Sequence, residues 1–370
     1  MKNLISIFLL GCHETKGTDD STVTTEDTSM YDTAIETDTG EHTDTSEEPD
    51  TAVEEYVYQP PSMSICDVSD EVEYGSLCVI RPSGLNPDAR DRFAETSFSD
   101  RNLGFGYHVI GFPSQGTTIK GIYIHFTGSM GRPYHQDNET YPSYVVLNEA
   151  MQAGYIIFQP AYHNRYAVNS PEECIGNPNV DNCAGDVRHE KITGVDHSTI
   201  VNVPPADAII PRLKTLFSYL EEVGFIFPIE PVVNDNINWS DLRVGGHSQG
   251  SGHALYITKY WDSAHTCLLG GPYDVPDEIP SIPPEDIADW YLDTSESVAL
   301  TKVRALTSSD DTSYEQFVKA YGALGMEENI HWNSFSASIY QDHNGEEVSG
   351  HAAVVKDPAY QSQRYTTCFE

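Results

Sequence analysis

The residues with the clearest catalytic chemistry are the five from Gly246 to Gly250, which read Gly-His-Ser-Gln-Gly. A strand pattern over 242–245 precedes them, and a helix pattern over 253–260 follows them. Glycines on either side of Ser248 let neighbouring backbones pass closely at a sharp strand-to-helix bend. Such a bend would project the Ser248 hydroxyl into a crevice as a nucleophile, with the helix N-terminus favouring developing negative charge.

A serine hydroxyl becomes a strong nucleophile only when a base removes its proton, and an acid orients that base. We expect His351 to be the base, because it follows the final predicted strand among small residues; His343 is the alternative. We expect Asp311 to be the acid, with Asp310 as the alternative, because both follow the predicted strand at 302–306. Either aspartate could instead cap the helix that comes next.

Two backbone N–H groups could stabilise the oxyanion of an acyl-transfer reaction. The first would be the amide of Gln249, directly after the nucleophile. The second would come from the loop Thr127-Gly128-Ser129-Met130-Gly131, which follows a predicted strand. We expect the Ser129 amide to be this second donor, with Gly128 allowing the turn.

The elements that must position these residues are short apolar runs alternating with helical patterns. Strands are predicted over 77–80, 107–112, 119–126, 155–158, 242–245, 267–269, 302–306 and 334–340. Helices are predicted over 144–153, 209–220, 253–260 and 314–324. The alternation indicates the α/β class, with a mostly parallel central sheet covered by helices on both faces. The earliest strands have no helix between them and are predicted to form an antiparallel edge.

Two insertions, residues 161–204 and 272–297, fit neither pattern. The first is rich in Asn, Pro, Asp and His, and the second contains several prolines. We expect both to lie over the ligand crevice at the C-terminal edge of the sheet, where long connections are often functional. Their candidate wall residues are Tyr162, His163, Tyr166, Trp290 and Tyr291.

Cysteine usage is typical of an exported protein. Apart from Cys12, six cysteines form an even set, which in such a chain suggests disulfides. The pairs Cys66–Cys78 and Cys174–Cys183 could close local loops, and Cys267–Cys368 would then tie the C-terminus to the core. No cysteine or histidine spacing resembles a zinc site, so no metal is expected.

The N-terminus has the composition of an export leader followed by a tether. An apolar run over 4–10 leads into Leu9-Leu10-Gly11-Cys12, which resembles a bacterial lipobox whose cysteine becomes lipidated. The Thr-, Asp- and Glu-rich segment that follows cannot bury enough apolar surface to order itself. We therefore expect export to the cell envelope with a lipid anchor at Cys12, and three segments: a signal peptide over 1–12, a disordered tether over 13–60 and a catalytic domain over 61–370.

The charge of the chain limits its partners. The sequence has 57 acidic and 20 basic residues, a formal net charge of −37, and residues 13–55 contribute 15 acidic residues and one Lys. The rest of the chain is also strongly acidic, which repels phosphate backbones and anionic headgroups. Nucleic acid is therefore not expected as a partner, and contact with a membrane is expected only through the anchor at Cys12.

From about residue 105 to 355, the chain resembles the α/β-hydrolase superfamily in its secreted bacterial esterase or lipase branch. Three elements match in order: the Thr127–Gly131 loop, the Gly246–Gly250 bend, and the pair formed by Asp311 and His351. The chain departs from the family in two places, because Thr127 replaces the usual His and the aspartate is doubled.

The resemblance implies a Ser-His-Asp acyl-enzyme mechanism that needs no cofactor and acts on a small-molecule or polymeric ester. A serine exopeptidase of the same fold is one alternative, although such enzymes usually carry a propeller or a sizeable cap domain. A surface-displayed binding protein that has lost activity is the other. The intact serine, acid, histidine and glycine bend argue against it.

Overall fold

The computed structural model describes residues 57–91, 105–177, 179–274, 287–296 and 298–370. The chain divides into two units, Met1–Glu54 and Glu55–Glu370. The first unit, with the predicted leader and Cys12, lies outside the described residues, as does most of the predicted tether. The second unit already includes Tyr58, which is buried and donates a hydrogen bond to the Pro113 carbonyl over 3.1 Å. The folded unit therefore begins before residue 61, where the catalytic domain is expected to start.

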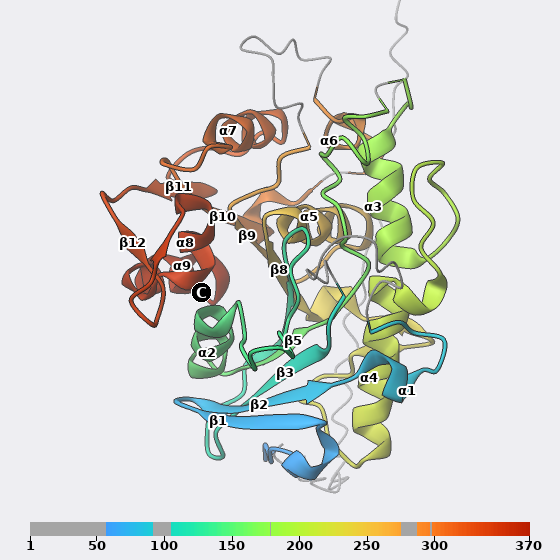
Figure 1. Ribbon diagram of the computed structural model, residues 1–370, viewed down its shortest axis with the longest axis vertical. Coiled ribbons are helices and arrows are strands. Elements are labelled where there is room, and N and C mark those ends of the chain that lie inside the picture. Colours follow the sequence, from blue (N-terminus) through green and yellow to red (C-terminus); the bar gives the residue numbers. More distant parts are fainter. Residues whose placement is uncertain (1–56, 92–104, 178, 275–286, 297) are drawn as a thin grey trace, which may run out of the picture. The chain divides into compact units, whose positions relative to one another are not determined.

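A mixed sheet of nine strands forms the centre of the second unit (Figure 1). Its strand order is β1-β2-β3-β5-β4-β8-β9-β10-β11. The strands are β1 (Val68–Val72), β2 (Gly75–Ile80), β3 (His108–Pro113), β4 (Gly121–Phe126), β5 (Tyr155–Gln159), β8 (Arg243–His247), β9 (His265–Leu269), β10 (Val303–Ser308) and β11 (Trp332–Phe335). The first three strands are antiparallel, and all pairs from β5 to β11 are parallel. The mostly parallel sheet and its antiparallel edge are as predicted.

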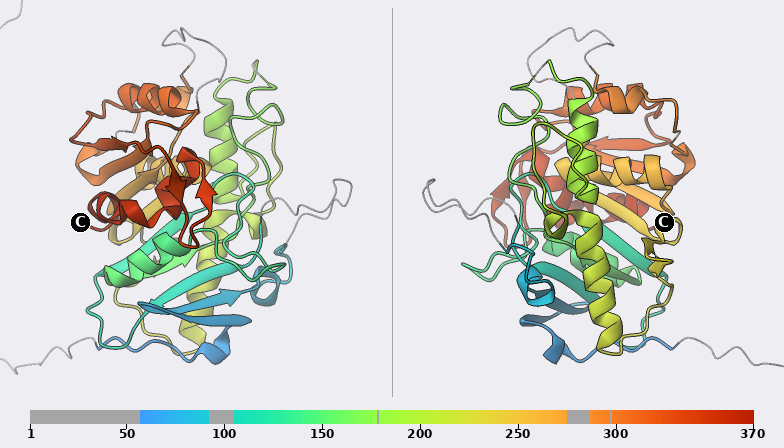
Figure 2. Two further views of the ribbon diagram at one scale, coloured as in Figure 1. Left: turned by 60° about the vertical axis from the view of Figure 1, so that its left-hand side comes forward. Right: turned by 90° about the vertical axis from the view of Figure 1, so that its right-hand side faces the viewer.

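Helices cover both faces of this sheet. They are α1 (Pro82–Leu85), α2 (Tyr144–Gln152), α3 (Cys183–Thr193), α4 (Ile209–Glu222), α5 (Gln249–Trp261), α6 (Asp289–Leu292), α7 (Tyr314–Ala323), α8 (Gly350–Lys356) and α9 (Gln361–Cys368). Figure 2 shows α2, α8 and α9 on one side and α3 and α4 on the other. Each side has its own apolar core, with Leu213, Phe217 and Leu255 in one and Val146 and Val354 in the other. None of the helices in the described part of the chain has the length and apolar character needed to cross a membrane.

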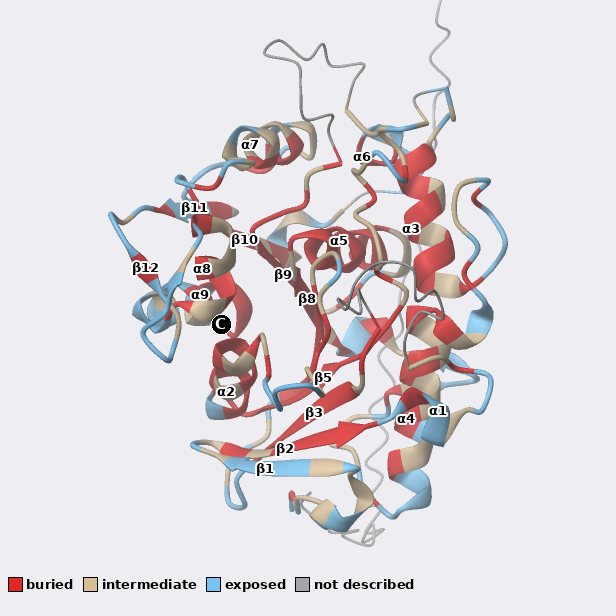
Figure 3. Cartoon of the chain, in the orientation of Figure 1, coloured by how far each residue is buried: buried red, intermediate tan, exposed pale blue. Residues whose placement is uncertain are grey.

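Burial along the strands follows from these two helical layers. Every residue of β3, β4 and β5 is buried, whereas β1 at the antiparallel edge is largely exposed (Figure 3). Strands covered on both faces need continuous apolar runs rather than alternation, which is why these segments were predictable as strands. The half-exposed, charged β1 gives no such signal, and its sequence does not reveal it.

Three further elements differ from the prediction. The predicted strand over 334–340 is divided between β11 and β12 (Tyr340–Gln341), which pairs with β13 (Glu347–Val348) in a separate small sheet. The insertion over 161–204 contains α3, whose mean composition is polar although most of its residues are buried. The segment from Gly350 onward, for which the sequence predicts no helix or strand, forms α8 and α9. Buried polar residues and short helices hide these elements from a periodicity analysis.

The three predicted disulfides are present. Cys66–Cys78 ties the start of the folded unit to β2, and Cys174–Cys183 ties the first insertion to the start of α3. Cys267–Cys368 joins β9 to the end of α9 across a sequence separation of 101 residues. The last bond closes the longest loop and therefore restricts the unfolded chain most in the chain-entropy description.

Candidate active site

Ser248 lies at the bend between β8 and α5, with φ 55° and ψ −121°. L-residues other than glycine rarely adopt this backbone conformation, and such strain is typical of functional turns. The flanking glycines permit the bend, because a Cβ on Gly246 would lie 2.3 Å from the Gly250 carbonyl carbon, and one on Gly250 would lie 2.2 Å from the Phe126 oxygen. The sequence motif thus folds into the predicted strand-to-helix bend.

Asp311, which follows β10, and His351, in the first turn of α8, lie next to each other. Asp311 Oδ2 lies 2.6 Å from His351 Nδ1, and the Asp311 side chain is 1% exposed while that of His351 is 31% exposed. The second carboxylate oxygen, Oδ1, accepts the N–H of Ser313 over 2.9 Å. The carboxylate therefore fixes the ring orientation and places the imidazole proton on Nδ1, which leaves Nε2 free to accept a proton.

The two alternative residues lie elsewhere. Asp310 Oδ2 accepts the Tyr340 hydroxyl over 2.5 Å and the Ala337 N–H over 3.2 Å, which fixes the connection between β11 and β12. His343 stacks on Tyr144 with ring centroids 4.7 Å apart. Among the described residues, neither contacts the Asp311–His351 pair through a hydrogen bond. The geometry favours Asp311 and His351, as expected from the sequence, although their catalytic roles stay predictions.

Ser248 and His351 both lie close to the segment Gly270-Gly271, which follows β9. A Cβ on Gly271 would lie 2.7 Å from the Ser248 carbonyl oxygen, and one on Gly270 would lie 3.6 Å from His351 Nδ1. Within the described residues, Ser248 Oγ and His351 Nε2 have no hydrogen-bond partner and are not bonded to each other. Such a contact often tightens only when substrate binds, so its absence does not exclude the pair.

His247 is a neighbour of the site that the sequence does not single out. Its Nε2 lies 2.8 Å from the His351 carbonyl oxygen, and the two rings have centroids 4.7 Å apart. Burial, followed by the proximity of His351, lowers the pKa of His247 well below its usual value. The neutral ring must carry its proton on Nε2 to donate to the carbonyl. His247 thus connects the nucleophile bend to the first turn of α8.

The two amides predicted to bind the oxyanion are unoccupied donors. Neither Ser129 N–H nor Gln249 N–H donates a hydrogen bond to any residue in the described ranges. The loop that carries Ser129 approaches the nucleophile closely, because a Cβ on Gly128 would lie 3.1 Å from Ser248 Cβ. Because neither N–H group has a partner within the described ranges, both could donate to an oxyanion formed at Ser248.

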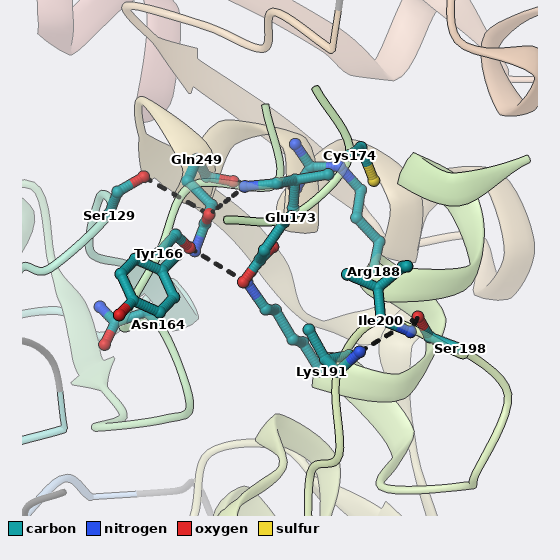
Figure 4. A network of polar contacts seen from close by, with 12 residues as sticks. Ser129, Asn164, Tyr166, Glu173, Cys174, Arg188, Lys191, Ser198, Ile200 and Gln249 are labelled. Carbon is teal, nitrogen blue, oxygen red and sulfur yellow. Dashed lines mark hydrogen bonds and ion pairs between the residues drawn. The ribbon is translucent and has the colours of Figure 1, made fainter. Parts of the chain in front are cut away.

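The side chains of the same two residues connect the loop to α5. Ser129 Oγ donates to Gln249 Oε1 over 3.4 Å, and the N–H of Val168 donates to the same oxygen over 2.9 Å (Figure 4). Behind Gln249, Arg188 of α3 donates to its carbonyl oxygen over 3.1 Å. The first insertion therefore contacts Gln249 directly, and it is linked to Ser129 through the Gln249 side chain.

Charged side chains are buried behind this region. Arg188 forms two hydrogen bonds of 2.5 Å to Asp274, and Lys191 contacts Glu173 at 2.7 and 2.8 Å (Figure 4 shows the second pair). Arg188 also lies 3.3 Å from Nδ1 of His253, whose pKa burial lowers well below its usual value. Buried charges persist only when paired, so the Arg188–Asp274 pair fixes the two insertions against each other and the Lys191–Glu173 pair fixes the first insertion internally.

Three of the aromatic residues that were candidates for the pocket wall pack in the core instead. Tyr162, Trp290 and Tyr291 are 0%, 1% and 4% exposed and belong to the apolar core. Tyr162 also donates its hydroxyl to the Thr127 carbonyl over 2.6 Å. Aromatic rings from these segments bury large surfaces, so they serve packing rather than recognition. Residues 275–286 of the second insertion lie outside the described residues.

Metal ligation has no support in the described ranges. No group of three or more His, Cys, Asp or Glu side chains there is arranged to hold a metal ion. All the cysteines of the folded unit are paired in disulfides, which removes the thiolates that a zinc site would use.

Comparison with known proteins finds similarity in structure only. No protein-family profile matches the sequence, and no curated protein sequence matches it. The chain is similar to fluorophosphonate-binding serine hydrolase F of Staphylococcus aureus, with 10% identity, a TM-score of 0.37 and coverage of 80% of this chain and 99% of that one. It is also similar to a Rhizomucor miehei esterase, with 12% identity, a TM-score of 0.36 and coverage of 80% and 83%. A ferulic acid esterase gives 12% identity, a TM-score of 0.37 and coverage of 70% and 91%.

These TM-scores lie below 0.5, so the fold assignment depends on the strand order and on where the site residues lie along it. Ser248 follows β8, Asp311 follows β10 and His351 follows β11, all at the carboxyl edge of the parallel strands. In α/β-hydrolases the nucleophile, acid and base have this chain order, and these are the roles that the sequence predicts for the three residues. The chain has the α/β-hydrolase fold.

Proposed function

We propose that this protein is a serine hydrolase that cleaves carboxylic esters through an acyl-enzyme intermediate. Ser248 would be the nucleophile, His351 the general base and Asp311 the acid that orients it. The proposal is supported most by one observation: a serine in a strained conformation after β8, with a histidine nearby whose Nδ1 lies 2.6 Å from a buried carboxylate. A core residue has no need of such strain.

In the proposed reaction, Ser248 Oγ attacks the ester carbonyl carbon while its proton moves to His351 Nε2. Asp311 stabilises the resulting imidazolium without taking the proton itself. The negative charge on the carbonyl oxygen is bound by the Ser129 and Gln249 amides. Collapse expels the alcohol, which takes the proton from His351, and water then releases the acid by the same steps in reverse order.

The proposed substrate is a neutral or cationic ester, either a small molecule or a polymer. The strongly acidic chain, with a formal net charge of −37, works against the approach of polyanions. No nucleic acid and no cofactor enter the proposed reaction.

A panel of p-nitrophenyl acyl esters, assayed with the full chain and with Ser248→Ala, tests this function. We expect turnover by the wild type and a loss of at least about 10³-fold in Ser248→Ala, with only the non-covalent contribution left. Ser240→Ala, a change at an exposed serine, serves as the matched control and should retain full activity.

Two other outcomes would each replace this function by an alternative. Faster turnover of aminoacyl anilides than of esters would indicate an exopeptidase of the same fold. No turnover of either class by a folded wild-type protein, together with no reaction with a fluorophosphonate, would indicate a binding protein.

We also propose that the protein acts outside the cytoplasm, attached to the cell envelope through a lipid on Cys12. The three disulfides of the folded unit support an oxidising environment. Metabolic labelling with a radioactive fatty acid tests the anchor: the wild type should be labelled, and Cys12→Ser should not. Equal labelling of both would contradict the anchor while leaving the enzymatic proposal intact.

A further inference from the structure

The oxyanion loop, defined as Thr127–Gly131, has a conformation that its own residues do not favour. Met130 adopts φ 60°, in the left-handed region, and the residue is 49% exposed. Within the loop, a single backbone hydrogen bond of 3.0 Å joins the Gly131 N–H to the Gly128 carbonyl. A methionine backbone in the left-handed region is unfavourable unless surrounding residues hold it in that conformation. Neither this backbone bond nor the 3.4 Å hydrogen bond from Thr127 Oγ1 to the Gly131 carbonyl involves Met130, so the restraint on Met130 must come from outside the loop.

Asn164, near the start of the first insertion, provides that restraint. Its Nδ2 donates to the carbonyl oxygens of Gly131 and Gly128 over 2.7 and 3.0 Å and to Thr127 Oγ1 over 3.1 Å. The backbone carbonyl of Asn164 accepts the Met130 N–H over 2.7 Å. The same side chain is 0% exposed, and its Oδ1 accepts the Phe105 N–H over 3.1 Å, so its amide orientation is fixed.

These contacts have a direct consequence for Ser129. Asn164 binds the residues on both sides of it, yet leaves the Ser129 N–H without a partner among the described residues. The loop also packs against the nucleophile, because a Cβ on Gly128 would lie 3.1 Å from Ser248 Cβ. A displacement of the loop would therefore change the distance from the Ser129 N–H to the reacting carbonyl oxygen.

We infer that Asn164 is a positioning residue for the oxyanion site, acting through the oxyanion loop rather than by touching substrate. Figure 4 shows it beside the network that joins Ser129 to Gln249. The first insertion was expected from the sequence to cover the crevice. Through Asn164 it also holds the oxyanion loop in place. This inference rests on the proposed function, since it assigns Asn164 a part in that reaction.

The test uses the full chain with Asn164→Ala and with Asn164→Asp. The Asp side chain has the same shape as Asn, but it places a carboxylate oxygen instead of an NH2 group next to the three oxygens that accept from Asn164. Both variants should lower kcat for a p-nitrophenyl ester by about 10- to 100-fold, with KM changed less than about 3-fold. The affinity for an arylboronic acid, whose tetrahedral adduct occupies the oxyanion position, should fall by a similar factor. Asn177→Ala is the matched control, because Asn177 Nδ2 donates within the same insertion, to the Glu173 carbonyl over 2.6 Å.

Different results would overturn the inference. One is a variant with unchanged kcat and unchanged boronate affinity. Another is a loss of activity equal to that of Asn177→Ala. If the Asn164 variants do not fold, Thr127→Val removes a hydroxyl that accepts from Asn164 over 3.1 Å and donates to the Gly131 carbonyl over 3.4 Å, and it should lower kcat and boronate affinity together by a few-fold. No change in Thr127→Val would then count against the inference. If the wild type itself shows no activity dependent on Ser248, the proposed function fails instead, which separates the two failures.

Discussion

Replacing Asp311 by Asn should remove almost all activity while leaving the site's shape intact. The Asp311 carboxylate lies 2.6 Å from His351 Nδ1 with its side chain 1% exposed, so an Asn can occupy the same space. An amide NH2 facing Nδ1 would make that nitrogen an acceptor and move the ring proton to Nε2. An Nε2 that already carries a proton cannot take the one from Ser248. The equivalent change in serine proteases lowers kcat about 10⁴-fold, and we expect a comparable loss, about 5.5 kcal/mol of transition-state stabilisation.

Asp310→Asn is the matched control for this change. The Oδ1 of the new amide can still accept both the Tyr340 hydroxyl and the Ala337 N–H, so kcat should stay within about 3-fold of the wild type. Initial rates with a p-nitrophenyl ester between pH 6 and 9 give kcat and KM for both variants. An Asp311→Asn enzyme within 10-fold of the wild type, or a greater loss in Asp310→Asn, would refute the assignment of the acid.

Three further outcomes are expected. His247→Phe should lower kcat about 10-fold, because the His351 carbonyl loses its 2.8 Å donor. His247→Gln keeps an N–H donor and should lower kcat less than about 3-fold. Equal losses of kcat in the two variants, measured as pH–rate profiles, would contradict the role of this hydrogen bond. Gly250→Ala should lower the free energy of unfolding by about 1–3 kcal/mol in urea titrations, because the new Cβ would lie 2.2 Å from a backbone oxygen. The control Gly322→Ala should be neutral or stabilising, because a Cβ there would have nothing within 4 Å. Burial lowers the pKa of His125 to about 3, so the unfolded chain binds its proton first and stability should fall as the pH drops below about 6.5. This histidine contributes up to about 1.4 kcal/mol per pH unit, and His125→Asn should lower the slope measured between pH 7 and 5 by that amount, while buried histidines such as His247 and His253 maintain the rest.

The elements of the candidate site were predictable because their signals are local. Gly246 and Gly250 are required by backbone contacts at the bend itself, so the motif and its flanking patterns contain the information. The strands β3, β4 and β5 are continuous apolar runs, because helices cover both of their faces. Two disulfides, Cys66–Cys78 and Cys174–Cys183, were predictable because their cysteines are close in sequence. The third, Cys267–Cys368, was predictable because these were the two cysteines left over.

The supporting residues could not be predicted, because their roles arise from long-range contacts. Asn164 reaches the oxyanion loop across more than 30 residues, and it stands in a polar insertion where a buried asparagine has no distinguishing pattern. Arg188 and Lys191 are buried within α3, which makes the helix look exposed to a periodicity analysis. The choice between Asp310 and Asp311 likewise depended on which carboxylate the fold turns toward His351, a difference that adjacent residues do not show in sequence.

The measurement that tests the central claim most directly is the mass of the protein after reaction with a fluorophosphonate, followed by peptide mapping of the adduct. We predict a single added phosphonyl group on Ser248, no adduct in Ser248→Ala, and a labelling rate lowered by at least about 10²-fold in His351→Ala. A folded wild type that stays unlabelled, or an adduct on another serine that forms equally fast in His351→Ala, would contradict the claim that His351 activates Ser248.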